Sequence, residues 1–205
     1  MKREHKSASV TQRELDQVLS QVRACTVCAD SLPFSPKPIL SVSATTKILI
    51  IGQAPGARVH EAGIPWQDQS GEILCSWMGI SRSLFSDNAL IGTMPMGFCF
   101  PGRKEGGGDL PPRPECAPLW HQEILAHLRE VQLMIFIGQY AIQAYLKPKL
   151  NLTETVHRFR DYLPDRFPIV HPSPLNFRWQ AKNKWFAEDV IPELQNRVQD
   201  IVGTN

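Results

Sequence analysis

Hydrophobic residues recur along the chain in two patterns that predict different elements. Residues 11–24 carry apolar side chains at helical spacing after a capping box formed by Thr11 and Glu14, which predicts a first helix. Short apolar runs rich in β-branched residues are typical of buried parallel strands. Such runs lie at residues 47–52, 89–95, 132–138 and, with a weaker pattern, 167–170.

Helical patterns separate these predicted strands, near residues 71–85, 117–130 and 139–146, and a last amphipathic stretch covers residues 181–202. Pro192 is expected to bend or divide that last helix. Strands that alternate with helices are typical of a three-layer α/β (αβα) fold with a mostly parallel sheet. Three prolines between residues 31 and 46 indicate an extended surface connection before the first strand.

Length and composition favour one domain. The 205 residues and 42% hydrophobic content fit a single compact domain over residues 1–205, with residues 1–10 expected to be flexible. Because 22 Lys and Arg residues nearly balance 20 Asp and Glu residues, the net charge of +2 does not by itself indicate a polyanionic partner. Any nucleic-acid binding must therefore be argued from local features.

The N-terminus has no secretory signal, and no stretch approaches the roughly 20 apolar residues of a membrane span. We therefore expect a soluble, cytoplasmic protein without membrane association. Five cysteines in such a chain are expected as reduced thiols, available for metal binding, reactivity or burial, rather than as a disulfide framework.

Two motifs directly follow predicted strands. The first, Gly52-Gln53-Ala54-Pro55-Gly56, is a turn whose backbone N–H groups a ligand can approach closely. The second is His171-Pro172-Ser173. Ligands of open α/β sheets bind beyond the carboxyl ends of the strands, so both motifs are expected on one rim. Gly/Pro turns are common and a lone histidine is usually structural, so neither motif identifies a function alone.

A third segment adds specificity. Gly63-Ile64-Pro65-Trp66 precedes Ser70-Gly71 and a predicted helix. The order and wide separation of the three segments resemble the uracil-DNA glycosylase superfamily, and the resemblance extends from Cys25 to the final helix. Trp66 falls on the family's position for the aromatic residue that stacks on the flipped base, although it could equally be an ordinary core or surface tryptophan.

The resemblance implies a DNA-repair glycosylase that acts on uracil or another deaminated base. In the family, the histidine at the position of His171 hydrogen-bonds the uracil oxygen where negative charge collects as the glycosidic bond breaks. Further residues that the resemblance places around the base are Gly52, Ala54, Pro55, Gly56 and Ser173.

Four cysteines form a candidate metal site. Cys25-x-x-Cys28 lies at the end of the first predicted helix, and Cys99 and Cys116 supply the other half. The arrangement resembles the iron–sulfur branch of the superfamily, its fourth family, in which four such cysteines hold a structural [4Fe–4S] cluster. Four thiolates also suit tetrahedral zinc, but zinc ribbons normally have a second close cysteine pair, so the cluster is favoured. Cys75 is expected to be a buried thiol.

Two segments are candidates for contact with DNA. Residues 100–115 contain Arg103 and Lys104 among glycines and prolines, a composition suited to a loop along a phosphate backbone. After the histidine motif, the resemblance implies a loop that enters the duplex, with Leu175 and Phe177 as wedges and Arg178 as a phosphate contact. The alternatives are a solvated loop and a charged helix start with Trp179 and Trp185 packed inward.

The chain departs from the family at its first motif. The iron–sulfur branch has Glu at the position of Gln53, and other branches have Asp or Asn at the position of Ala54, so the usual carboxylate is absent. A glutamine can orient water but cannot accept its proton. Asp68 is the preferred substitute, and Gln53 is kept as a catalytic candidate. Glu72 is expected to cap the following helix.

The family's uracil-reading Asn is not visible in residues 94–98, which leaves Asn176 as a candidate for that contact. Two hypotheses follow: a monomeric glycosylase that hydrolyses the N-glycosidic bond in uracil-containing DNA, and a base-binding or DNA-binding member of the same fold that has lost hydrolysis. A structural iron–sulfur protein without DNA contact is the third possibility.

Overall fold

The computed structural model describes residues 2–203 and gives side-chain surroundings from residue 11 onward. Within these residues the centre is a four-stranded sheet with the spatial order β2-β1-β3-β4. Its strands are β1 (Ile48–Ile51), β2 (Ile91–Thr93), β3 (Leu133–Ile137) and β4 (Arg166–Ile169). Every neighbouring pair is parallel, so the four predicted strands and their parallel arrangement are confirmed.

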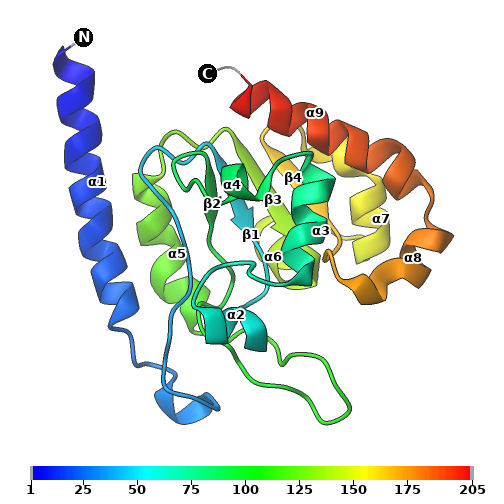
Figure 1. Ribbon diagram of the computed structural model, residues 1–205, viewed down its shortest axis with the longest axis horizontal. Coiled ribbons are helices and arrows are strands. Elements are labelled where there is room, and N and C mark those ends of the chain that lie inside the picture. The colour runs from blue at the N-terminus through cyan, green and yellow to red at the C-terminus, as the bar shows by residue number, and fades with distance from the viewer. Residues whose placement is uncertain (1, 204–205) are drawn as a thin grey trace.

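Helices cover both faces of the sheet, which confirms the three-layer α/β fold (Figure 1). The helix α1 (Lys2–Arg23) packs against α5 (Cys116–His127) on one face, and α3 (Gln69–Met78) packs against α9 (Ile191–Val202) on the other. The remaining α-helices are α2 (Ala57–Ala62), α4 (Arg82–Phe85), α6 (Gly138–Tyr145), α7 (Leu152–His157) and α8 (Phe177–Lys182). No helix in the described part of the chain is long and apolar enough to cross a lipid bilayer.

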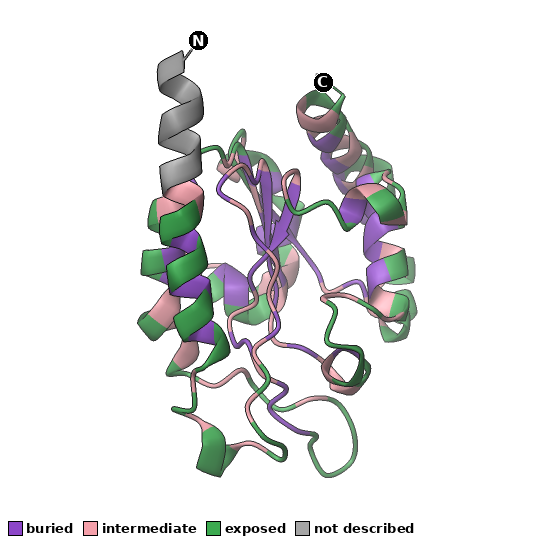
Figure 2. Ribbon diagram, turned by 60° about the vertical axis from the view of Figure 1, so that its left-hand side comes forward, coloured by how far each residue is buried: buried purple, intermediate pink, exposed green. Residues whose placement is uncertain are grey.

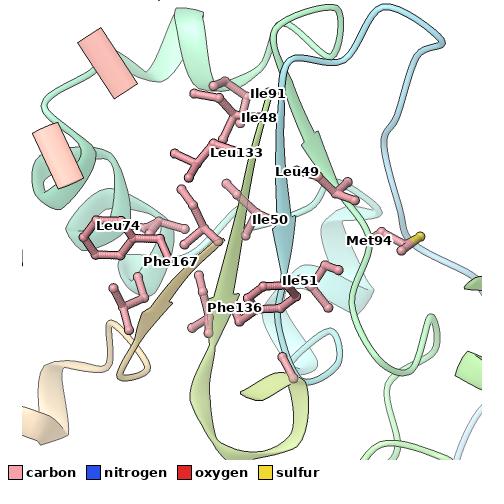
Figure 3. Close-up of a cluster of buried hydrophobic side chains, with 14 of the residues drawn as sticks. Ile48, Leu49, Ile50, Ile51, Leu74, Ile91, Met94, Leu133, Phe136 and Phe167 are labelled. Carbon is pink, nitrogen blue, oxygen red and sulfur yellow. The ribbon is translucent and has the colours of Figure 1, made fainter. Parts of the chain in front are cut away.

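The sheet forms the centre of the hydrophobic core. All four residues of β1 are buried, and Ile48 pairs with Ile91 of β2 and with Leu133 of β3. Figure 3 shows these side chains gathered around the strands with Leu74 and Phe167. Figure 2 shows the buried strands between the outer helices. A strand covered on both faces needs apolar residues at every position, which explains the continuous runs in the sequence.

Several helix boundaries differ from the sequence prediction. The first helix begins at Lys2, so Thr11 lies inside it and not at its N-cap. Met1 and the side chains of residues 2–10 lie outside the described residues, and the flexibility expected for residues 1–10 stays a prediction. The helix predicted near 71–85 is divided into α3 and α4, because Gly79 has a φ of 68° and ends α3 in a left-handed C-cap.

The C-terminal helical region is divided before Pro192, at residues 183–185, and not at the proline. A π-helix (Phe186–Val190) leads directly into α9, where Pro192 occupies the first turn and is tolerated. The short helices α2 and α7 were missed, although α7 begins with a capping box of Asn151 and Glu154. Short 3-10 turns lie at Ala29–Ser31, between α1 and β1, and at Phe159–Tyr162, between α7 and β4.

The connection at residues 31–46 is not wholly on the surface, contrary to the prediction. Ile39, Val42 and Ala44 are buried in it, and Ser41 forms an antiparallel bridge with Thr93 of β2. The prolines make this segment extended, as expected, and an extended segment beside an open strand edge can satisfy its backbone groups by pairing with that strand.

Candidate functional site

A cavity of about 450 Å³ opens beyond the carboxyl ends of β1 and β4, within the range of small-molecule sites. Helix α2 and the long loop of residues 100–115 lie at this same end of the sheet (Figure 1). The predicted site residues that line the cavity are Gly52, Gln53, Ala54, Pro55, Gly56, Trp66, Asp68, Arg103, His171, Ser173 and Leu175. The two motifs and the tryptophan segment therefore meet in one site, as the fold predicted.

The first motif forms the floor of the cavity, and its glycines permit close packing. A side chain at Gly52 would place a Cβ 3.2 Å from the Trp66 ring, and one at Gly56 would place a Cβ 3.3 Å from a carboxylate oxygen of Asp109. Gly56 is also the N-cap of α2, with an extended backbone. The turn thus brings the tryptophan wall and an acid close to the end of β1.

Gln53 joins this floor to the 100–115 loop. Its side-chain Nε2 donates a hydrogen bond of 3.0 Å to the carbonyl oxygen of Leu110. Its own carbonyl oxygen accepts a hydrogen bond of 3.0 Å from the backbone N–H of Gly97. The amide nitrogen of Gln53 is therefore committed to anchoring a loop, a contact that an ionised glutamate could not make because it has no proton to donate.

Trp66 forms one wall of the cavity in a backbone conformation that is unusual for a bulky residue, with a φ of 57°. The guanidinium of Arg82 holds this turn by donating a 2.7 Å hydrogen bond to the carbonyl oxygen of Trp66. Gly71 follows in α3, and a Cβ at Gly71 would lie only 1.9 Å from the same oxygen. The Ser70-Gly71 pair noted in the sequence thus permits the tryptophan turn.

His171 lies next to Trp66 in the lining of the cavity, with ring centroids 5.8 Å apart and ring planes 30° apart in a stacked arrangement. Burial lowers the pKa of His171, while the carboxylates of Asp68 and Asp109 act in the opposite direction. The net effect favours a neutral imidazole near pH 7, which can donate a hydrogen bond from one ring nitrogen.

The backbone after His171 is tightly held. Its carbonyl oxygen accepts hydrogen bonds from the backbone N–H of Ser173 at 2.8 Å and from the side-chain Nδ2 of Asn176 at 2.7 Å. Asn176 lies at an adjacent pocket with Lys104 and does not line the main cavity. Its amide nitrogen supports the histidine loop, and a contact of Asn176 with the base stays a prediction.

Asp68 lines the cavity and also begins α3. Its Oδ1 accepts a 3.0 Å hydrogen bond from the backbone N–H of Gly71, so Asp68 is the N-cap of the helix. Glu72 was expected to cap this helix but lies one turn further on, where its carboxylate is 3.8 Å from Arg82. The capping role therefore belongs to Asp68 because the helix begins at Gln69, earlier than the sequence pattern indicated.

Asp109 is the site residue that sequence reasoning missed. It follows three glycines with positive φ, Gly106, Gly107 and Gly108, and forms an antiparallel bridge with Arg103 that closes this turn over the cavity. Burial raises the pKa of Asp109, and Asp68 raises it further, while Arg103 and His171 lower it. An acid directly after a glycine run in a loop already suspected of binding DNA was a signal in the sequence.

The four predicted metal ligands gather around a second cavity. Cys25, Cys28, Cys99 and Cys116 all line it, among mostly apolar neighbours. Burial raises the pKa of Cys116 to about 12, and its sulfur accepts a 3.3 Å hydrogen bond from the backbone N–H of Phe98. Cys75 is buried elsewhere, in α3, as predicted.

Within residues 2–203, no three His, Cys, Asp or Glu side chains converge closely enough to hold a single metal ion. Tetrahedral zinc would need its sulfurs about 3.8 Å apart, given Zn–S bonds of about 2.3 Å. A four-iron cluster accepts a more open set of thiolates, because each sulfur binds a different iron atom.

The predicted wedge residues are exposed beside the cavity. Leu175 and Phe177 have 84% and 61% of their surface accessible, on a 3-10 turn (Pro174–Asn176) and the start of α8. The Arg178 guanidinium lies 5.5 Å from the centre of the Phe177 ring. Trp179 instead packs toward the core and donates a 3.0 Å hydrogen bond to Thr153, which confirms the inward alternative for this tryptophan.

Trp185 also packs inward, with its ring nearly perpendicular to that of Trp179 and 5.7 Å away between centroids.

In a comparison with models of protein families, residues 41–195 match the model described as the Uracil DNA glycosylase superfamily. The match includes every residue that lines the main cavity from Gly52 to Leu175 and begins after Cys25 and Cys28.

Proposed function

Because the chain belongs to the uracil-DNA glycosylase superfamily, we propose that it hydrolyses the N-glycosidic bond of uracil or another deaminated base in DNA, after the base is rotated out of the helix. The observation that carries this proposal is the pair of neighbouring rings, Trp66 and His171, that line one cavity at the carboxyl ends of the strands. DNA is the partner, and flipping brings the base within reach of the site.

Each ring has a distinct part in the proposed reaction. Trp66 offers a flat apolar wall on which the flipped base stacks. His171 is neutral and donates a hydrogen bond to the carbonyl oxygen of the base, where negative charge develops as the bond breaks. Residues 52–56 line the same cavity, and the backbone N–H groups of this turn other than at Pro55 are the proposed further donors.

DNA contacts are proposed on both sides of the cavity. Leu175 and Phe177 are exposed apolar side chains that can fill the space of the expelled nucleotide. Arg178 lies beside them, and Arg103 and Lys104 are exposed on the opposite loop, where cationic side chains can contact phosphates.

A binding protein without hydrolysis is the second candidate function. The observation that favours it is the first motif, in which Ala54 carries no polar side chain and the Gln53 amide is already bonded to Leu110. Such a protein would hold uracil-containing DNA selectively and release no base.

An excision assay on uracil-containing single-stranded and double-stranded oligonucleotides tests the proposal. The unmodified protein is expected to leave abasic sites, and His171→Ala is expected to lower the single-turnover rate by about 10²- to 10³-fold, as for the loss of one donor to a developing oxyanion. His127→Ala, at the end of α5, is the matched control. No abasic product on any deaminated base contradicts the proposal, and selective binding without product supports the second candidate.

We also propose that Cys25, Cys28, Cys99 and Cys116 hold a [4Fe–4S] cluster, with zinc as the alternative ligand of the same thiolates. The convergence of all four on one apolar cavity and the Phe98 N–H that points at the Cys116 sulfur support this. Burial raises the pKa of Cys116, and a bound cation offsets that cost by stabilising the thiolate. When bound, the group supplies a structural link between the end of α1 and the 99–116 segment.

A further inference from the structure

Hydrolysis of the glycosidic bond usually employs a carboxylate to orient water and to stabilise positive charge on the sugar, and the first motif does not supply one. Two acids line the main cavity, Asp68 and Asp109, and they come from opposite sides of it. The two carboxylates differ in the contacts that they make within the protein.

Asp68 is committed to the protein. Its Oδ1 accepts the hydrogen bond from the Gly71 N–H that caps α3. The residue therefore fixes the start of the helix that follows the Trp66 turn, and movement of its carboxylate toward a substrate would uncap the helix.

Among the contacts described for residues 11–203, the Asp109 carboxylate makes no hydrogen bond or salt bridge to another protein group. Its carboxylate oxygen lies over the first motif, 3.3 Å from the position that a Cβ on Gly56 would take, and Gly56 belongs to the turn expected to contact the base. It also lies close enough to His171 for each to influence the charge of the other. The Asp109 carboxylate thus lies against the first motif, in the lining of the cavity that also contains His171.

The loop that carries Asp109 is held in place by the residue that replaces the family's acid. The Gln53 amide donates to the carbonyl oxygen of Leu110, the next residue after Asp109, and the Leu110 N–H donates to the Gly102 carbonyl oxygen at 2.9 Å. An antiparallel backbone pairing between Arg103 and Asp109 closes the turn that these two hydrogen bonds hold. The Gln53 side chain therefore helps to fix the position of Asp109, because it bonds the residue that follows Asp109 in the loop.

We propose that Asp109 is the catalytic carboxylate of this site and that Gln53 is a positioning residue that holds the Asp109 loop over the cavity. The inference rests on the proposed glycosylase function and assigns its missing acid to the loop between the third and fourth cysteines.

In the proposed step, the bond between C1′ of the sugar and the base nitrogen breaks, and its electron pair leaves with the base as an anion hydrogen-bonded to His171. The oxygen of a water molecule held by the Asp109 carboxylate forms a bond to C1′, and one water proton passes to the carboxylate. That proton then goes to solvent or to the departing base. The products are the free base and an abasic sugar, and no further reactant is consumed.

The pH dependence follows from the groups that face Asp109, which are Arg103, His171 and Asp68. Burial raises its pKa above the ordinary aspartate value, Arg103 and His171 act against this rise, and the Asp68 charge adds a smaller rise. A base must be ionised to accept a proton, so the excision rate is expected to fall as the pH drops through this raised pKa. Removing the Asp68 charge lowers the pKa of Asp109 and moves that acidic limb to lower pH.

Single-turnover excision of uracil by the full chain, measured across pH together with the affinity for uracil-containing DNA, tests the inference. Asp109→Asn is expected to reduce the rate at least about 100-fold and to abolish the acidic limb while binding changes little. Asp68→Asn, which keeps a capping side chain, is expected to reduce the rate no more than about tenfold and to move the limb to lower pH. Glu105→Gln is the matched control, an exposed acid of the same loop.

Gln53→Met tests the positioning role, because it removes the donor to Leu110 without adding a charge to the cavity. The rate is expected to fall and the acidic limb to shift, with the affinity for DNA unchanged, because the Asp109 loop loses its anchor to the first motif. If the acidic limb of the pH profile is the same in this variant as in the unmodified protein, Gln53 does not position Asp109.

The outcomes separate the inference from the proposed function. If the unmodified protein excises uracil and Asp109→Asn keeps its rate, or if Asp68→Asn alone abolishes the rate, the inference is overturned and the function stands. An Asp109→Asn variant that loses affinity and keeps its maximal rate makes Asp109 a base-reading residue and also overturns the inference. If the unmodified protein releases no base, both fall together.

Discussion

At the scale of single residues, Trp66 has a backbone conformation that L-amino acids seldom adopt. A non-glycine residue in the left-handed region costs roughly 1–3 kcal/mol, and such strain persists where the surroundings determine it. Here Arg82 bonds the Trp66 carbonyl oxygen, and Gly71 leaves room for that oxygen. The strain places the indole against Gly52 and opposite His171, where it forms a wall of the cavity.

Gly71→Ala is expected to disturb this arrangement, because the new Cβ would lie 1.9 Å from the Trp66 carbonyl oxygen. Alanine normally favours a helix, but overpacking against backbone costs about 1–3 kcal/mol and exceeds that gain. We expect a lower free energy of unfolding by denaturant and slower uracil excision. Ser76→Ala, an exposed substitution in the same helix, is the control, and equal behaviour of the two variants would contradict the strained-turn argument.

At the scale of elements, the segment after β4 does two things at once. Its backbone is fixed by hydrogen bonds from Ser173 and Asn176 to the His171 carbonyl oxygen. Its apolar side chains, Leu175 and Phe177, are left in solvent at the cavity edge. Exposed apolar side chains on a rigid turn beside a binding site are expected to meet a partner surface.

The Leu175→Ala and Phe177→Ala double variant is expected to slow excision from double-stranded DNA by about tenfold or more and to affect single-stranded DNA much less, because only a duplex has a base stack to open. Thermal unfolding should change little, since both side chains are exposed. The single-stranded substrate is the internal control. An equal loss on both substrates would argue against a wedge and for a general contact with DNA.

At the scale of the whole molecule, the cysteine cavity joins parts of the chain that are distant in sequence. Cys25 and Cys28 follow α1, and Cys99 and Cys116 flank the loop that carries Asp109. A group bound by all four thiolates would restrain α1 and that loop together and thus support the main cavity from outside it.

Cys99→Ala is expected to abolish the visible absorbance and iron content of anaerobically purified protein and to lower its thermal stability, because a bound group that is absent from the unfolded chain stabilises the fold. Cys75→Ala, in α3 and away from the cysteine cavity, is the matched control and should keep its iron. A colourless protein with stoichiometric zinc would favour the alternative metal. Protein without either metal would contradict the site.

Much of this fold could be predicted from the sequence alone. The four strands were found because a strand covered on both faces must be apolar throughout. The meeting of the two motifs on one rim followed because the carboxyl ends of parallel strands lie at the same edge of a sheet. The wide separation of Gly52 and His171 in the chain was no obstacle, since both directly follow strands.

Only the tertiary structure decided the contacts of the acids. The contacts of Asp68, Asp109 and Gln53 depend on how an irregular loop, closed by positive-φ glycines, folds back over the end of β1. Side chains in such a loop follow no sequence period, so their neighbours cannot be read from spacing. The sequence therefore determined the sheet, its rim and the meeting of Trp66 and His171 there, and the folded loop decided which further carboxylate, Asp109, lines the same cavity.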